Sequence, residues 1–328
     1  TFLLYLCFRK TINVTITVMK KIFASIVLAT LALASMNAQD LAQITELYNT
    51  GASALSSGDK TIALKAFEEA YAQATALGEE GKEIADNCKG VIPDLYLSIA
   101  KDLAKAADYD GAVAGLKTAV EMAQKYGSED VAEQAKTLIP QIVMQKGGAL
   151  LNSKKYEEAA AAYKEVVDAD PANGTAALRM GMALNAAGKA EEAKAALEQA
   201  AANGQEKAAY KQLGNISLKE AVAALKAKKY ADAVTAAVKS SEYVPSAQAF
   251  QIAGQASQLA GKNNDAIKYF EKYLELAPNA KNATQIAYIV GTLYQGAKNN
   301  AKAKEFYAKA VSDPQYGAEA KKMLDALK

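Results

Sequence analysis

The chain has 328 residues, of which 51% are hydrophobic and 23% are charged, and its formal net charge is +2. It contains no histidine, which removes the commonest general base, the Ser-His and Cys-His nucleophile systems and the usual zinc ligand. The near-neutral charge gives no sign of the clustered basic face that a nucleic-acid partner requires, so no nucleic acid is expected.

The N-terminal segment predicts a leader rather than part of a folded domain. Residues 19–38 begin with Met19 and two lysines, continue with a short apolar core and end in small residues, which is typical of a bacterial secretory signal peptide cleaved after Ala38. Residues 1–18 match nothing downstream and are interpreted as an upstream extension from a misplaced start. An uncleaved membrane anchor is the alternative, although the apolar run is short for a membrane span. We therefore expect an exported protein, periplasmic or secreted, with no stable membrane span after cleavage.

Export has a direct test at the N-terminus. Mature protein isolated from cells is expected to begin near Gln39 and to lack residues 1–18. Removal of residues 1–38 takes away four of the 38 basic residues and none of the 36 acidic ones, so the net charge changes from +2 to −2. N-terminal sequencing checks this expectation, and a first residue of Thr1 would contradict it.

From residue 40 onward, amphipathic helices alternate with short polar turns. The first predicted hairpin ends its first helix at Ser57-Gly58-Asp59. Two longer units follow, at residues 83–120 and 130–167, and they place Pro93 and Pro140 at equivalent positions of extended first helices. Proline lacks an N–H group and clashes with the preceding turn, so it either kinks each helix or divides it in two.

Four more hairpins and a last helix complete the predicted array. The fourth hairpin closes at Ala202-Asn203-Gly204, and the fifth has an extended lead-in. In the sixth, residues 247–280, Gly261 stops the first helix and Pro278 ends the second. Residues 317–328 form a final helix whose polar face predicts a terminal cap.

A pattern of small residues repeats in all seven hairpins. One alanine recurs in every second helix, and we name these the anchor alanines: Ala63, Ala112, Ala159, Ala193, Ala233, Ala266 and Ala303. Four residues after most of them stands a bulkier residue such as Phe270, and twelve residues before each stands a small residue such as Gly254. Because helices approach closely only where both present small side chains, Gly254 and Ala266 are predicted to face each other where the two helices cross.

On these residues the chain resembles the tetratricopeptide repeat family over roughly residues 44–328. The small-residue pair, the aromatic Phe270 and the closing Pro278 match its motif, whereas the family's tryptophan is absent and Phe250 stands in its place. Successive anchor alanines are 33 to 49 residues apart, around the family's usual ~34. The resemblance implies an all-α, right-handed α-solenoid of about seven helix–turn–helix repeats with a C-terminal capping helix, spanning residues 40–328.

The sequence offers little for catalysis, and no cofactor and no metal are predicted. It has neither a phosphate-binding glycine loop nor a dinucleotide-binding fingerprint. Cys88 is alone once the leader is gone and is interpreted as a small buried helix residue. The acidic pairs at residues 68–69, 157–158 and 191–192 are predicted to fall at or near the starts of second helices, where they interact favourably with the helix dipole.

The first helices of repeats six and seven carry an amide-rich row. The family resemblance implies that first helices line a concave groove. The predicted partner-binding residues there are Gln248, Gln251, Gln255, Gln258, Gln285, Tyr288, Thr292 and Gln295. Their spacing by three, four and three residues places each row on one helix face, and we expect these side chains to be exposed. Glutamine donates and accepts hydrogen bonds, which suits the backbone of an extended peptide, although a solvated face chosen for helix propensity fits equally well.

We therefore predict a non-catalytic scaffold that binds a protein or peptide partner through its concave groove. The first alternative is a structural subunit of a cell-envelope assembly that binds a folded partner through its convex face or terminal repeats. The least favoured alternative is a hydrolase that uses carboxylates.

Overall fold

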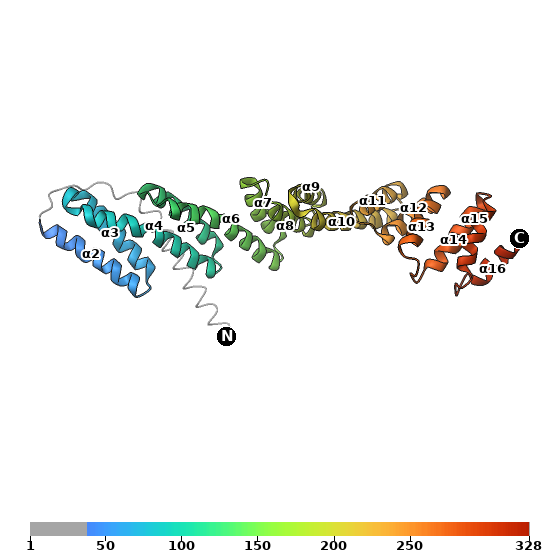
Figure 1. Ribbon diagram of the computed structural model, residues 1–328, viewed down its shortest axis with the longest axis horizontal. Coiled ribbons are helices and arrows are strands. Elements are labelled where there is room, and N and C mark those ends of the chain that lie inside the picture. The colour runs from blue at the N-terminus through green and yellow to red at the C-terminus, as the bar shows by residue number, and fades with distance from the viewer. Residues whose placement is uncertain (1–37, 328) are drawn as a thin grey trace. The chain divides into compact units, whose positions relative to one another are not determined.

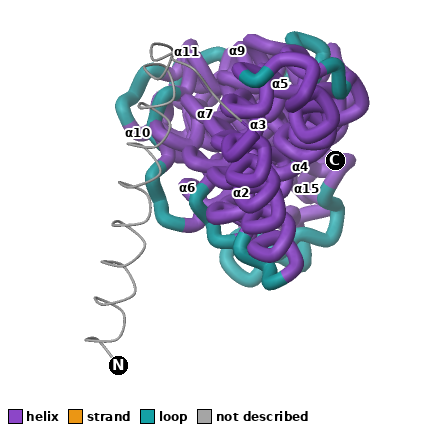
Figure 2. The backbone as a smooth tube through the Cα atoms, turned by 90° about the vertical axis from the view of Figure 1, so that its left-hand side faces the viewer, coloured by secondary structure: helices purple, strands orange, loops and turns teal. Residues whose placement is uncertain are grey.

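The computed structural model describes residues 38–327, so the predicted upstream extension and all of the predicted signal peptide except Ala38 lie outside the described residues. Within that range the chain consists of helices and short turns, with no β-strand (Figures 1 and 2). No described helix is long and apolar enough to cross a membrane. The all-α prediction is confirmed.

The seven predicted helix pairs and the final helix are all present in residues 38–327 (Figure 1). In chain order the elements are α2 (Ala38–Ser56), α3 (Lys60–Ala76), η2 (Gly78–Gly81), α4 (Lys82–Lys105), α5 (Tyr109–Tyr126), α6 (Glu129–Asn152), α7 (Tyr156–Ala169), α8 (Gly174–Ala186), α9 (Ala190–Ala200), η3 (Ala201–Gln205), α10 (Glu206–Lys226), α11 (Tyr230–Tyr243), α12 (Ala247–Leu259), α13 (Asn263–Leu276), α14 (Ala283–Gly296), α15 (Asn300–Ala310) and α16 (Gly317–Ala326).

The described chain forms two compact units that divide between Ala149 and Leu150, inside α6. Unit one contains α2 to α5 and most of α6, and unit two contains α7 to α16. Within each unit a second helix packs on the first helix of the next repeat, as α3 does on α4 and α11 on α12. Two short helices cannot bury their apolar faces alone, so this stacking supplies each repeat with its core.

The two internal prolines lie inside continuous helices. Pro93 is within α4 and Pro140 within α6, so neither helix is divided in two. Pro93 is fully buried, together with Ile92 and Leu95 on either side of it. Packing of this apolar segment against the neighbouring helices keeps α4 continuous despite the hydrogen bond that proline removes.

The crossing of the two helices in the sixth hairpin includes a bulky side chain that the prediction did not place there. All seven anchor alanines are buried. A Cβ atom built on Gly254, however, would lie 2.5 Å from Cδ1 of Phe270, and its three nearest heavy atoms all belong to that ring. The closest contact of Gly254 is therefore with Phe270, the bulky residue four positions after Ala266. Long side chains on a helix point back toward its N-terminus, so the Phe270 ring reaches the level of the preceding turn.

Every hairpin turn has one residue in the left-handed region. These residues are Gly58, Ala107, Lys154, Gly188, Lys228, Gly261 and Lys298. The fourth turn shows the hydrogen bonding: the Lys189 N–H donates to the Leu184 carbonyl, with an N···O distance of 2.9 Å, as in a Schellman motif. The same turn forms with alanine or lysine at four of the seven positions, although a side chain there costs about 1–2 kcal/mol.

Replacement of Ala107 (φ 61°) by glycine is expected to stabilise unit one. Glycine adopts this conformation without steric penalty, and its greater freedom in the unfolded chain offsets part of the gain. The free energy of unfolding should rise by about 0.5–1 kcal/mol. Urea unfolding measures the change, and the matched control Gly188→Ala (φ 81° at Gly188) should lower it by about 1 kcal/mol. A loss of stability in Ala107→Gly would contradict this account of the turn.

Candidate functional site

The α12 part of the predicted amide row is accessible. Gln248, Gln255 and Gln258 are exposed and Gln251 is half-buried. None of the four side chains forms a hydrogen bond with another described residue, and helical spacing keeps them on one face of α12. Their amide groups are therefore available to a ligand.

The α14 part of the row is already engaged within the fold. Tyr288 stacks on Tyr316, with ring centroids 4.9 Å apart and planes 13° apart, and its ring centroid is 5.8 Å from that of Tyr307. The Tyr307 hydroxyl donates to Oε1 of Gln295 at 2.6 Å, and the Thr292 hydroxyl donates to a backbone carbonyl of its own helix at 2.7 Å. All four residues of the α14 row, Gln285, Tyr288, Thr292 and Gln295, are half-buried. The expectation that Gln251 and Tyr288 are exposed is wrong, since both are half-buried. The residues just before α16 fold against Tyr288.

Reasoning from the sequence did not identify the apolar residues that occupy the equivalent positions on the preceding first helices. Relative to the small residue of each repeat, the positions of Gln251 and Gln255 are apolar on α8 and α10. They hold Leu178 and Met182 on α8, and Leu218 and Val222 on α10. Met182 is 41% exposed and the other three are half-buried. Counting from the same small residue in every repeat would have found them, since the offset is constant.

A shallow hollow joins α10 to the amide row. Its volume is about 360 Å³, and its lining residues are Leu218, Lys219, Val222, Ala223, Lys226 and Gln248. We name the surface formed by Leu178, Met182, Leu218, Val222, Gln248, Gln251 and Gln255 the first-helix face of unit two. It places apolar side chains next to unused amides, the combination that most ligand-binding sites show.

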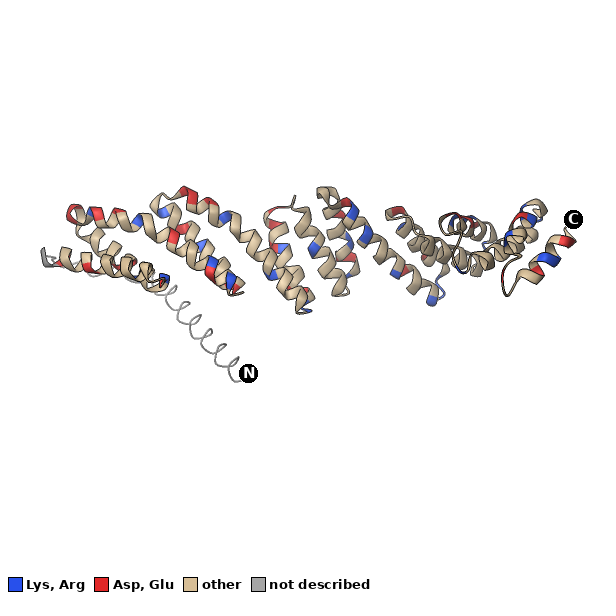
Figure 3. Cartoon of the chain, turned by 60° about the horizontal axis from the view of Figure 1, so that its bottom comes forward, with Lys and Arg blue, Asp and Glu red and all other residues tan. Residues whose placement is uncertain are grey.

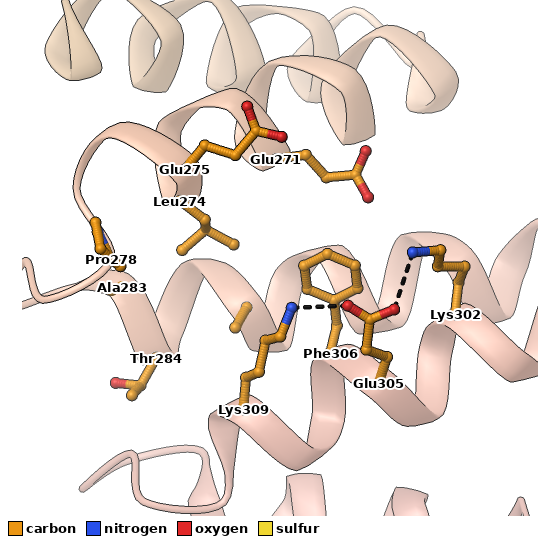
Figure 4. A pocket seen from close by; sticks show the side chains of 11 residues that line it. Glu271, Leu274, Glu275, Pro278, Ala283, Thr284, Lys302, Glu305, Phe306 and Lys309 are labelled. Carbon is orange, nitrogen blue, oxygen red and sulfur yellow. Dashed lines mark hydrogen bonds and ion pairs between the residues drawn. The ribbon is translucent and has the colours of Figure 1, made fainter.

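A second hollow, of about 670 Å³, opens between α13, α14 and α15 (Figure 4). We name it the second-helix pocket. Its lining residues are Glu271, Leu274, Glu275, Pro278, Ala283, Thr284, Ala287, Lys302, Glu305, Phe306 and Lys309. The carboxylates of Glu271 and Glu275 lie on the α13 side, opposite the Phe306 ring on α15, and Leu274 points from α13 into the space between them (Figure 4). None of these residues belongs to the first-helix face.

The charges of the second-helix pocket are unevenly compensated. Glu305 accepts hydrogen bonds from Nζ of Lys309 at 2.8 Å and from Nζ of Lys302 at 2.9 Å, and these bonds lower its pKa to about 2. Glu271 accepts a hydrogen bond from the Tyr294 hydroxyl at 2.8 Å. Glu275 forms neither a hydrogen bond nor an ion pair with another described residue. The α13 side therefore carries the uncompensated negative charge.

Two of the predicted acidic pairs lie at the starts of second helices and form surface ion pairs, whereas Glu68 and Glu69 lie in the middle of α3. Glu157 lies 3.3 Å from Nζ of Lys189, and Glu191 lies 2.9 Å from Nζ of Lys194. Both carboxylates are exposed, and positive and negative residues are interspersed along the helices (Figure 3). Exposed pairs of this kind add little stability, and their geometry is that of a solvated helix surface. Within residues 38–327, no group of three or more histidine, cysteine or acidic side chains is placed to hold a metal ion.

Cys88 is fully buried, as the sequence predicts. Burial raises the pKa of its thiol to about 11, so the reactive thiolate is disfavoured. The side chain, on α4, is part of the unit one core.

Helical hairpins that stack with buried small residues at their crossings define a helical repeat protein. Three tetratricopeptide repeat models match the sequence, at residues 97–174, 150–216 and 247–280. The chain contains tetratricopeptide repeats over these residues.

Solved structures with a similar fold include other proteins of this type. One is the MamA protein, at 21% identity over 56% of this chain and 96% of that chain, with a TM-score of 0.36. Another is YrrB, described as a TPR protein with an unusual peptide-binding site, at 22% identity over 55% of this chain and 91% of that chain, with a TM-score of 0.32. A third is pilF of Pseudomonas aeruginosa, at 16% identity over 57% of this chain and 88% of that chain, with a TM-score of 0.28. No curated protein matches the sequence.

Proposed function

We propose that the chain is a non-catalytic interaction scaffold that binds an extended peptide or protein segment through the first-helix face of unit two. The observation that carries this proposal is the row of amides on α12, Gln248 to Gln258, which the fold itself does not use, beside apolar side chains on α10. An extended segment offers backbone N–H and C=O groups to such amides, and its side chains offer apolar contact area. The absence of histidine from the sequence and the ion-paired acidic residues at helix starts support the non-catalytic part.

We also propose that the scaffold works outside the cytoplasm. The support is the sequence of residues 19–38, which has the charge pattern and length of a secretory signal peptide. Its partner would then be a protein of the cell envelope or the exterior.

The double variant Gln251→Ala/Gln255→Ala tests the first-helix face. Each amide bond to a peptide backbone contributes about 0.5–1.5 kcal/mol, so partner affinity should fall roughly tenfold. The free energy of unfolding should change by less than about 0.5 kcal/mol, because neither side chain is hydrogen-bonded within the fold. The measurement is titration calorimetry with a purified partner first recovered from envelope extract by the unaltered chain. Tyr288 is left unchanged, because its stacking on Tyr316 makes its loss a stability effect.

Two exposed glutamines of unit one provide the matched control. The variant Gln43→Ala/Gln134→Ala removes the same groups from α2 and α6, and it should bind normally. Because the amide row is uncharged, binding should depend only weakly on salt. An affinity that survives the Gln251→Ala/Gln255→Ala change but collapses in moderate salt would place the interface elsewhere.

A further inference from the structure

The second-helix pocket exists because repeats six and seven are joined differently from repeats five and six. Residues 277–282 connect α13 to α14, whereas residues 244–246 alone connect α11 to α12. The longer connection is accompanied by a space between the second helices α13 and α15. This space lies outside the first-helix face, so what it binds is a separate question from the proposed function.

The lining of the second-helix pocket is mixed, with five charged side chains around a small apolar strip. Ala283 and Ala287 of α14 form its floor, and both are buried. Leu274 is half-buried on one wall, and Phe306 is 4% exposed on the other. The Phe306 ring is already covered, since it stacks on Tyr294 and Nζ of Lys309 lies 4.4 Å from its centroid. The hollow of about 670 Å³ therefore has room for a ligand side chain next to Leu274 rather than on the Phe306 ring.

The length of the pocket sets the size of its occupant. On α15 the lining residues run from Lys302 to Lys309, and on α13 from Glu271 to Glu275. At 1.5 Å per residue, two helical turns extend about 10 Å, which matches about three residues of extended chain or two turns of a partner helix. A short segment fits, and a large flat surface does not.

The charge at the rim of the pocket determines which charge a complementary ligand carries. Lys302 and Lys309 already share Glu305, whereas Glu275 has no partner among the described residues. Glu271 accepts a hydrogen bond from the Tyr294 hydroxyl and lies within electrostatic reach of Lys302. Glu271 and Glu275 are one helical turn apart on α13, and both carboxylates border the pocket (Figure 4). A basic side chain next to an apolar one complements this arrangement.

We propose that the second-helix pocket binds a short basic and apolar segment of a partner protein. An apolar side chain of that segment packs against Leu274, and a lysine or arginine of the segment pairs with Glu271 and Glu275. The scaffold then has two binding surfaces in unit two, one on first helices and one on second helices.

The test uses the full chain and four classes of synthetic peptide, each about a dozen residues long. The peptides carry leucine with lysine, leucine with glutamate, serine with lysine, or serine with glutamate, and fluorescence anisotropy measures their affinities. Only the leucine–lysine class should bind well. The variant Glu271→Gln/Glu275→Gln should lower that affinity roughly five- to tenfold, as expected for two partly exposed ion pairs. The control Glu165→Gln/Glu192→Gln removes two exposed carboxylates from α7 and α9 and should leave it unchanged.

A charge reversal separates lost binding from lost folding. Glu275→Lys should weaken the leucine–lysine class and strengthen the leucine–glutamate class, a gain that an unfolded chain does not show. An unchanged preference for lysine in both α13 variants would overturn the proposal. So would binding of no class together with self-association that the Glu271→Gln/Glu275→Gln variant abolishes, because the occupant would then be a second copy of the chain.

Discussion

The variant Gly254→Leu is expected to lower the free energy of unfolding by about 3 kcal/mol, the upper end of the usual cost of overpacking. Even a single Cβ atom at this position would lie 2.5 Å from the Phe270 ring, closer than real side chains approach. Phe270 is only 1% exposed, so its ring has no open space into which to move. Urea or thermal unfolding measures the loss, and an unchanged melting temperature would show that the two helices do not cross at this point.

The position of the damage is a second part of the same prediction. Each repeat contacts only its neighbours, so amide hydrogen exchange should accelerate in α10 to α15 and much less in α7 and α8. The control is Gly296→Ala near the end of α14, where an added Cβ has no heavy atom within 4 Å. That change should be neutral or stabilising by up to about 1 kcal/mol. In a Gly254→Ala background, Phe270→Leu should restore part of the lost stability, since the smaller side chain makes room.

The hairpins could be predicted from the sequence because their signals are local. The anchor alanines, the turn at Gly261 and the stop at Pro278 each act within a few residues, and the structure has helix boundaries at both places. The contact of Gly254 with Phe270 could not be predicted in the same way. It depends on the direction in which a long side chain leaves its helix, and small-residue spacing contains no such information. The left-handed turn at Ala107 shows the converse, because packing of the hairpin imposes a conformation that alanine itself disfavours.

The candidate site could be predicted only where a single helix determines it. Helical periodicity fixes which face of α12 the glutamines occupy, and there Gln255 is exposed as predicted although Gln251 is half-buried. Burial of Tyr288 by Tyr316 depends on how the residues before α16 return to the core, which no periodicity describes. The second-helix pocket depends on three helices and on the connection at residues 277–282. Its residues converge only in the folded unit.

A polar contact in the unit one core has the other large expected effect. Tyr96 on α4 is 3% exposed, and its hydroxyl donates a hydrogen bond to the half-buried carboxylate of Glu68 on α3. Burial raises the pKa of Glu68, while the bond from Tyr96 and the charge of Lys125 on α5 oppose the rise and Glu69 on the same helix adds to it. The hydrogen bond from Tyr96 and the positive charge of Lys125 therefore offset part of the cost of burying the Glu68 carboxylate.

Removal of that donor by Tyr96→Phe should lower the free energy of unfolding at neutral pH by about 1.5–3 kcal/mol, the usual contribution of a hydrogen bond to a charged group. Glu68→Gln should not lower it, because a glutamine oxygen accepts the same hydrogen bond without a buried charge. The control Tyr48→Phe, whose half-buried ring packs edge-on against Phe67 at 5.3 Å, should change stability by less than about 0.5 kcal/mol.

The pH dependence distinguishes a tolerated carboxylate from a stabilising one. The folded-state pKa of Glu68 lies above its unfolded value, near 4.5, so Glu68 binds a proton more tightly in the folded chain than in the unfolded chain. The resulting stability is complete below the unfolded pKa and is lost as the pH rises through the folded pKa. Urea unfolding should therefore show Glu68→Gln more stable than the unaltered chain at neutral pH, with the difference shrinking on acidification. A Glu68→Gln chain that is less stable at neutral pH would mean that Tyr96 and Lys125 more than compensate for burial, and that the carboxylate itself holds α3, α4 and α5 together.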